Sequence, residues 1–215
     1  CLQNDKQKHL IDNISFTIQP GEKVCIMGEG GAGKSLLLEL IGGTIKNYTG
    51  TINVNKIPLN NLNQKEFRKN IGIFYNEQDI FNGTVYDNIC IGNESISANE
   101  IMKIAEILEI KEFISLLPNG LYTELQATGK GLSTIIAKKI LLLRAIVNKP
   151  ELLILDEPFE LAGAESSKKI SDYLCNVQNT TCLVASGYLP YAKNCDLVIW
   201  LEKGKIKHIG EPKSI

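Results

Sequence analysis

The pattern of apolar and polar residues along the chain predicts short strands that alternate with helices. Apolar runs or strict apolar alternation predict strands at residues 14–18, 23–27, 51–55, 71–75, 152–155, 181–185, 197–201 and 205–209. Apolar residues at helical spacing predict helices at residues 34–41, 64–69, 98–117, 133–147 and 166–177. Continuous apolar strands such as residues 152–155 are typical of a buried parallel sheet. The pattern therefore predicts an α/β fold with a mostly parallel sheet.

One stretch interrupts this alternation, because the pattern is nearly all helical between residues 88 and 148. We expect a single domain over residues 1–215, with a core at about 1–87 and 149–215 and an inserted α-helical subdomain at about 88–148. Residues 202–204 (EKG) separate the last two predicted strands and are typical of a hairpin, so this part of the β-structure is expected to be antiparallel.

Composition and charge are those of an ordinary globular protein. Hydrophobic residues make up 44% and charged residues 22%, and the formal net charge is −1. We expect no nucleic-acid partner, because that would need a basic excess or a basic stripe. The six cysteines show neither C-x-x-C spacing nor a histidine at zinc-ligand spacing, a pattern that suits a reducing compartment.

No segment is predicted to cross a membrane. The longest apolar run, residues 135–147, is interrupted by Lys138, Lys139 and Arg144 and falls short of the roughly 18 apolar residues that a span needs. Residues 1–10 are polar, so we expect no signal peptide. If the function involves a membrane, another chain or segment is expected to provide the span.

A phosphate-binding loop is the strongest chemical signal. Residues 28–35 (GEGGAGKS) match the pattern G-x-x-x-x-G-K-[ST], between a predicted strand and a predicted helix. Glycines allow backbone N–H groups to curve around phosphates, and the helix N-terminus favours an anion. We expect Lys34 to reach the β- and γ-phosphates of ATP and Ser35 to ligate Mg²⁺. The predicted nucleotide-binding residues here are Gly28, Gly30, Gly31, Ala32, Gly33, Lys34, Ser35 and Leu36.

Two carboxylates follow the apolar run at residues 152–155. We expect Asp156 to hold Mg²⁺ and Glu157 to orient and polarise the attacking water, so that Glu157 and Lys34 are the candidate catalytic residues. Parallel strands end at one edge of a sheet, which would bring this pair to the phosphate loop.

By these residues the chain resembles the nucleotide-binding domain of ABC transporters of the exporter type, nearly end to end from Leu10 to Ile215. Further matching segments are residues 10–18 with 20–22 (PGE), 80–85 (IFNGTV) with 87–89 (DNI), 113–120 with Thr123, 150–158, and 202–206 (EKGKI) with Gly210.

The resemblance implies a P-loop NTPase (RecA-like) core, with ATP and Mg²⁺ as cofactors. It also implies two partners. One is a second nucleotide-binding domain, identical or different, because two such domains sandwich two ATP molecules. The other is the set of transmembrane domains of an exporter, which would place this chain at the cytoplasmic face of a membrane.

Four positions depart from the family pattern. The signature sequence Leu-Ser-Gly-Gly-Gln is here residues 132–136 (LSTII), which keeps Ser133 as a donor to the partner's ATP but replaces both glycines. Gly187 stands where the switch histidine belongs, and Gly163 where the D-loop aspartate belongs. Asn76 aligns with the Q-loop glutamine, with Gln78 as the less favoured alternative.

The sequence does not identify the adenine-stacking aromatic, since residues 1–13 contain neither Tyr nor Phe, so either the chain is a fragment that starts late or adenine is held differently. Two hypotheses follow. The intact Lys34 and Glu157 favour an ATPase that drives transport. The altered positions, all at groups that contact a γ-phosphate or the partner, favour a degenerate half that binds ATP, dimerises with a competent domain and hydrolyses little.

Overall fold

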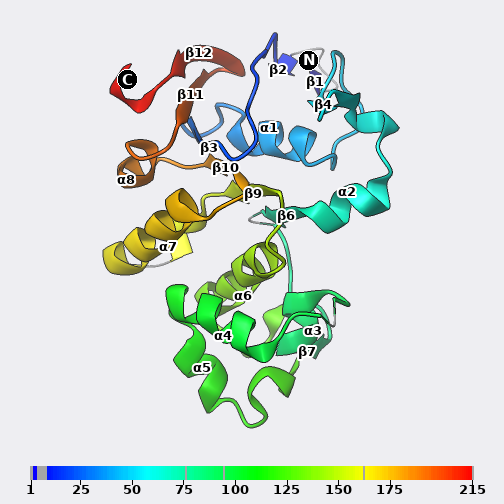
Figure 1. Ribbon diagram of the computed structural model, residues 1–215, viewed down its shortest axis with the longest axis vertical. Helices are drawn as coiled ribbons and strands as arrows, with labels where there is room; N and C mark the ends of the chain where they lie inside the picture. The colour runs from blue at the N-terminus through cyan, green and yellow to red at the C-terminus, as the bar shows by residue number, and fades with distance from the viewer. Residues whose placement is uncertain (1, 4–8, 76, 94, 162, 215) are drawn as a thin grey trace.

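A computed structural model describes residues 2–3, 9–75, 77–93, 95–161 and 163–214 (Figure 1). Its main sheet has six strands in the order β12-β11-β3-β10-β9-β6. All neighbours in it pair in parallel except β11 and β12, which form the antiparallel hairpin. The strands are β3 (Lys23–Met27), β6 (Ile71–Phe74), β9 (Leu152–Asp156), β10 (Thr181–Ala185), β11 (Leu197–Glu202) and β12 (Lys205–Gly210).

Helices and three two-stranded ribbons surround this sheet. The helices are α1 (Lys34–Ile41), α2 (Gln64–Asn70), α3 (Val85–Cys90), α4 (Ala98–Ile107), α5 (Lys111–Leu116), α6 (Thr134–Val147), α7 (Ala164–Asn176) and α8 (Leu189–Ala192). The ribbons are β1 (Leu2–Gln3) with β2 (His9–Ile11), β4 (Asn53–Val54) with β5 (Ile57–Pro58), and β7 (Gly83–Thr84) with β8 (Glu124–Leu125).

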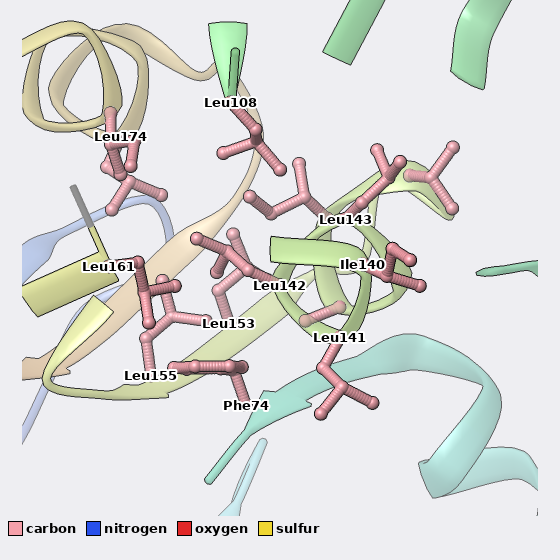
Figure 2. Packing of buried hydrophobic residues seen from close by; sticks show 14 of the residues in the cluster. Phe74, Leu108, Ile140, Leu141, Leu142, Leu143, Leu153, Leu155, Leu161 and Leu174 are labelled. Carbon is pink, nitrogen blue, oxygen red and sulfur yellow. The ribbon is translucent and has the colours of Figure 1, made fainter. Parts of the chain in front are cut away.

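The central strands are buried on both faces, as their continuous apolar sequences predict. Successive side chains of a strand point to opposite faces, and β3 accordingly divides between two cores. Val24 and Ile26 pack with Leu38 of α1, whereas Cys25 and Met27 belong to the cluster on the opposite face. In that cluster, side chains of α6 meet those of β6 and β9 (Figure 2). Each fully buried leucine there stabilises the folded protein by about 1.5–3 kcal/mol relative to an exposed leucine.

The helical lobe lies beyond the end of the sheet, where α3 and α4 pack against α6, and α5 packs against α4 (Figure 1). The inserted helical subdomain is thus present, while its boundaries at about residues 88 and 148 stay a prediction. None of the helices in the described parts of the chain is both long and apolar enough to cross a membrane.

Most predicted elements are confirmed within one or two residues, but three predictions were wrong or incomplete. Residues 14–18 half-bury Ile14, Phe16 and Ile18, yet they form no strand and no described strand pairs with them. They instead line a broad cavity of about 1550 Å³ together with residues 48–56. The strand predicted at residues 51–55 is reduced to Asn53–Val54.

The single helix predicted at residues 98–117 is two helices. Glu109 takes a left-handed conformation (φ 55°) between α4 and α5, which ends the first helix. The apolar periodicity continues across this break because Leu108, Ile110 and Ile114 are all buried in one core. Periodicity reports which residues are buried, and here it did so without revealing the change in backbone direction.

Candidate nucleotide-binding site

The phosphate loop connects β3 to α1, and its backbone requires glycine. Gly28, Gly31 and Gly33 have φ values of 149°, 77° and 101°. At Gly28 a Cβ would lie 2.3 Å from the carbonyl oxygen of Leu201, so that no other residue fits without moving β11. The hairpin holds the loop from outside, since the N–H of Gly204 donates to the carbonyl of Ala32 (3.0 Å).

The loop delivers the chain to the N-terminus of α1. Gly33 is the N-cap residue, and it provides no side-chain cap. The first turn also contains no acidic residue, so no side chain of that turn offsets the positive field of its backbone N–H groups. A pocket of about 340 Å³ opens at this point. Its walls are formed by Gly30, Gly31, Ala32, Gly33, Lys34, Ser35, Leu36, Asp156 and Glu157.

The side chain of Lys34 folds back over the loop that precedes it. Its ammonium Nζ donates to the carbonyl of Gly28 (2.8 Å) and lies 3.7 Å from Oε1 of Glu157. Both side chains are largely buried, at 14% and 19% exposure. Sequence reasoning predicted that these two residues would meet, and the geometry brings them together.

The end of β9 brings a buried carboxylate to the same pocket. Asp156 is only 5% exposed, and its Oδ1 makes no hydrogen bond with any described residue. Burying a carboxylate oxygen without a partner destabilises the folded protein, unless a cation or a hydrogen-bond donor binds to it. Ser35 lies on the same pocket wall and offers a second oxygen.

These two oxygens fit a magnesium ion. Among the described residues, no group of three or more His, Cys, Asp or Glu side chains is placed to hold a metal. Mg²⁺ does not need such a cage, because it retains several waters and takes one or two protein oxygens together with substrate phosphates.

Glu157 stands at the turn that follows β9. It takes a left-handed conformation (φ 48°), and its N–H donates to the carbonyl of Ala185 at the end of β10 (2.8 Å). Burial raises the pKa of its carboxyl, while a hydrogen bond with Ser186 and the charge of Lys34 oppose that rise. Ser186 is a site residue that the sequence pattern did not identify.

The other predicted site residues lie away from this pocket or outside the described residues. Ser133 is the N-cap of α6 and accepts from the N–H of Ile136 (3.2 Å), in the helical lobe. Gln78 uses its amide to bind the backbone of Tyr75 and Ile73 at the end of β6. Asn76, the predicted Q-loop residue, lies outside the described residues.

Two of the departures from the family pattern occupy open space. At Gly163 and at Gly187, an added Cβ would meet nothing within 4 Å. Gly163 is the N-cap of α7, and Gly187 directly follows Ser186. Neither position therefore requires glycine for steric reasons.

The parallel sheet, the glycine loop at the start of α1 and the acidic pair after β9 define a P-loop NTPase. The family model for ABC transporters matches residues 11–160, and the chain belongs to that family. The signature, Q-loop, D-loop and switch positions are not tested by this match, and their departures stay an interpretation of the sequence.

Individual relatives are exporters and other ABC transporters. The chain is 31% identical, over 94% of its length, to the ABC-type transmembrane transporter verA of Clonostachys rogersoniana, of which it covers 16%. It is 31% identical, over 95% of its length, to an ATP-dependent lipid A-core flippase of Saccharophagus degradans, of which it covers 35%. The chain thus spans between about a sixth and a third of these relatives.

A solved structure resembles the whole chain. The structure of a bacterial Atm1-family ABC exporter with ATP bound superposes with a TM-score of 0.86 and 25% sequence identity. The match covers 98% of this chain and 37% of the exporter chain. The chain accordingly has the fold of the ATP-binding domain of ABC exporters.

Proposed function

We propose that this chain binds and hydrolyses Mg-ATP to drive the transport of a substrate across a membrane, as the ATPase domain of an exporter. The observation that carries the proposal is the convergence of Lys34, Ser35, Asp156 and Glu157 on one pocket at the N-terminus of α1. This combination supplies a cation for the phosphates, oxygens for a metal, and a carboxylate for water.

Each residue has a distinct role in this proposal. The backbone N–H groups of Gly30, Gly31 and Gly33 surround the β-phosphate, and Lys34 turns from the carbonyl of Gly28 to the β- and γ-phosphates. Ser35 and Asp156 would hold Mg²⁺, which when bound neutralises charge on the phosphates. Glu157 accepts a hydrogen bond from the attacking water and orients it toward the γ-phosphate.

We further propose a second nucleotide-binding domain as partner, with Ser133 of this chain directed at the ATP of that partner. Ser133 is exposed at the start of a long helix, as a donor to a ligand on another molecule must be. Thr134 and Ile135 are also exposed there, and Ile135 is 53% exposed. The remaining partners are transmembrane domains of an exporter, which place the chain at the cytoplasmic face of a membrane. No nucleic acid is involved.

Phosphate release by the purified chain tests the ATPase activity. The wild type is compared with Glu157→Gln, and with Glu112→Gln as the matched control, because Glu112 is an exposed carboxylate of α5 and not part of the pocket wall. The expected result is a rate that falls at least about a hundredfold in Glu157→Gln and is unchanged in Glu112→Gln. ATP binding without a rate that depends on Glu157 would overturn hydrolysis by this chain and identify a nucleotide-binding half.

A further inference from the structure

Ser186 lies at the end of β10, between the two strands that carry the phosphate loop and the acidic pair. It is 2% exposed. Its N–H donates to the carbonyl of Ile26 (3.1 Å), which extends the pairing of β10 with β3 by one residue. The backbone of Ser186 is therefore fixed on the β3 side, and its side chain is excluded from solvent.

The hydroxyl oxygen of Ser186 accepts a hydrogen bond from one neighbour, and its proton is available to another. The N–H of Tyr188 donates to Oγ (3.1 Å), which occupies a lone pair of the oxygen. The hydroxyl proton is then free to point away from Tyr188. The Ser186 side chain is close enough to the Glu157 carboxylate for their contact to oppose the rise in its pKa that burial causes.

Glu157 is held from the same strand through its backbone. Its N–H donates to the carbonyl of Ala185, the residue before Ser186. On its other side, Oε1 of the carboxylate lies 3.7 Å from the ammonium Nζ of Lys34 on α1. A glutamate side chain has several rotatable bonds, and these contacts restrict it to one orientation toward the pocket.

We propose that Ser186 is a positioning residue for Glu157. The Ser186 hydroxyl donates to one oxygen of the Glu157 carboxylate and keeps that carboxylate oriented toward the attacking water. The inference rests on the proposed function and adds a residue to that site. The next residue, Gly187, has no side chain that shares this task. Substrate contact is not required of Ser186, because it acts through Glu157.

Steady-state kinetics on the full chain test this role with three variants. Ser186→Ala removes the donor, and Ser186→Thr retains it. Ser171→Ala controls for the loss of any buried serine hydroxyl, since Ser171 is 3% exposed and belongs to α7, away from the pocket. Hydrogen bonds to charged groups are stronger than those between neutral groups. We therefore expect kcat to fall about tenfold or more in Ser186→Ala, with KM for ATP unchanged.

The other expected results are recovery of most of the rate in Ser186→Thr and an unchanged rate in Ser171→Ala. In a Glu157→Gln background, Ser186→Ala should have no further effect, because the two residues act as a unit. A Ser186→Ala enzyme as fast as the wild type, or an equal loss in Ser171→Ala, overturns the proposal.

A second readout separates this inference from hydrolysis itself. If the wild type shows no turnover, the proposed ATPase activity fails, and positioning is judged from the ¹³C signal of the Glu157 carboxyl in labelled protein. Ser186→Ala should shift that signal and Ser171→Ala should leave it in place. An unmoved signal in Ser186→Ala overturns the positioning role independently of activity.

Discussion

The ammonium Nζ of Lys34 lies 3.7 Å from Oε1 of Glu157, although the two residues belong to segments far apart in the sequence. One opens α1 and the other follows β9, and β10 lies between β9 and the strand β3 that leads to α1. The contact exists because parallel strands deliver their carboxyl ends to the same edge of the sheet. Lys34 also donates to the carbonyl of Gly28, so two acceptors hold its charge at the mouth of the pocket.

Lys34→Ala should abolish nucleotide binding, because it removes the only lysine on the wall of the pocket within the described residues. Binding of a fluorescent ATP analogue measures the effect, and affinity should fall at least about a hundredfold, as expected for the loss of a charge-assisted contact. Lys46→Ala is the control, since Lys46 is exposed beyond the end of α1. Retained affinity in Lys34→Ala would mean that the phosphate loop is not the main binding site.

The sequence predicted this part of the site because each piece has a local signature. The glycine loop, the apolar run and the acidic pair are each contiguous, and the rule for parallel strands joins them. Ser186 has no such signature. Its role depends on the position of β10 between β3 and β9. The periodicity of apolar residues along a sequence does not reveal the order of the strands in a sheet.

The fold shows the same division between local and long-range information. The alternation at residues 14–18 correctly predicted which side chains are half-buried, namely Ile14, Phe16 and Ile18. It could not predict that no described strand would pair with them, because a strand is defined by its neighbour. In the same way, the apolar pattern did not reveal the left-handed backbone conformation of Glu109 between α4 and α5.

Gly28→Ala should destabilise the protein, whereas Gly30→Ala should not. A Cβ on Gly28 would meet the carbonyl oxygen of Leu201 at 2.3 Å, while one on Gly30 would meet nothing within 4 Å. Overpacking of this kind typically costs about 1–3 kcal/mol, to which the positive φ of Gly28 adds. Urea denaturation of both variants measures the difference in the free energy of unfolding. Equal stabilities would contradict the close approach of the loop to β11.

Replacing Thr134 and Ile135 together by glycine should restore the two glycines of the family's signature sequence at the start of α6, with Ile136 left in place of the glutamine. Each glycine should lower the stability by roughly 0.5 kcal/mol through helix propensity, since both sites are exposed. In exchange, the first turn of α6 no longer carries branched side chains where the partner's ATP is expected. ATP-dependent dimerisation, followed by analytical ultracentrifugation of a Glu157→Gln background, should become stronger.

Thr134→Ala with Ile135→Ala is the matched control for that experiment, because it removes the branched side chains without the freedom of glycine. If the alanine pair dimerises as well as the glycine pair, side-chain bulk alone limits ATP-dependent association. If neither pair strengthens ATP-dependent association, the signature position does not limit dimerisation and the interpretation of this segment as degenerate is wrong.

Gly187→His should increase the rate of ATP hydrolysis. The resemblance to exporters places the switch histidine at this position, where an imidazole would contact the γ-phosphate and the attacking water. The backbone accepts the substitution, since Gly187 is exposed, has no positive φ and would place a Cβ with nothing within 4 Å. A correctly placed imidazole is expected to raise kcat about tenfold to a hundredfold, with little change in the KM for ATP.

Gly187→Ala separates the imidazole from a mere stiffening of the backbone, because both variants lose the freedom of glycine equally. Only the histidine variant should be faster than the wild type, and the gain should disappear when Glu157→Gln is added, since the imidazole acts on a water that Glu157 orients. A histidine variant no faster than the alanine variant would show that the missing side chain at Gly187 does not limit turnover. The limit would then lie in the other altered positions, which are the signature segment at the start of α6, Gly163 before α7 and the Q-loop position at residue 76.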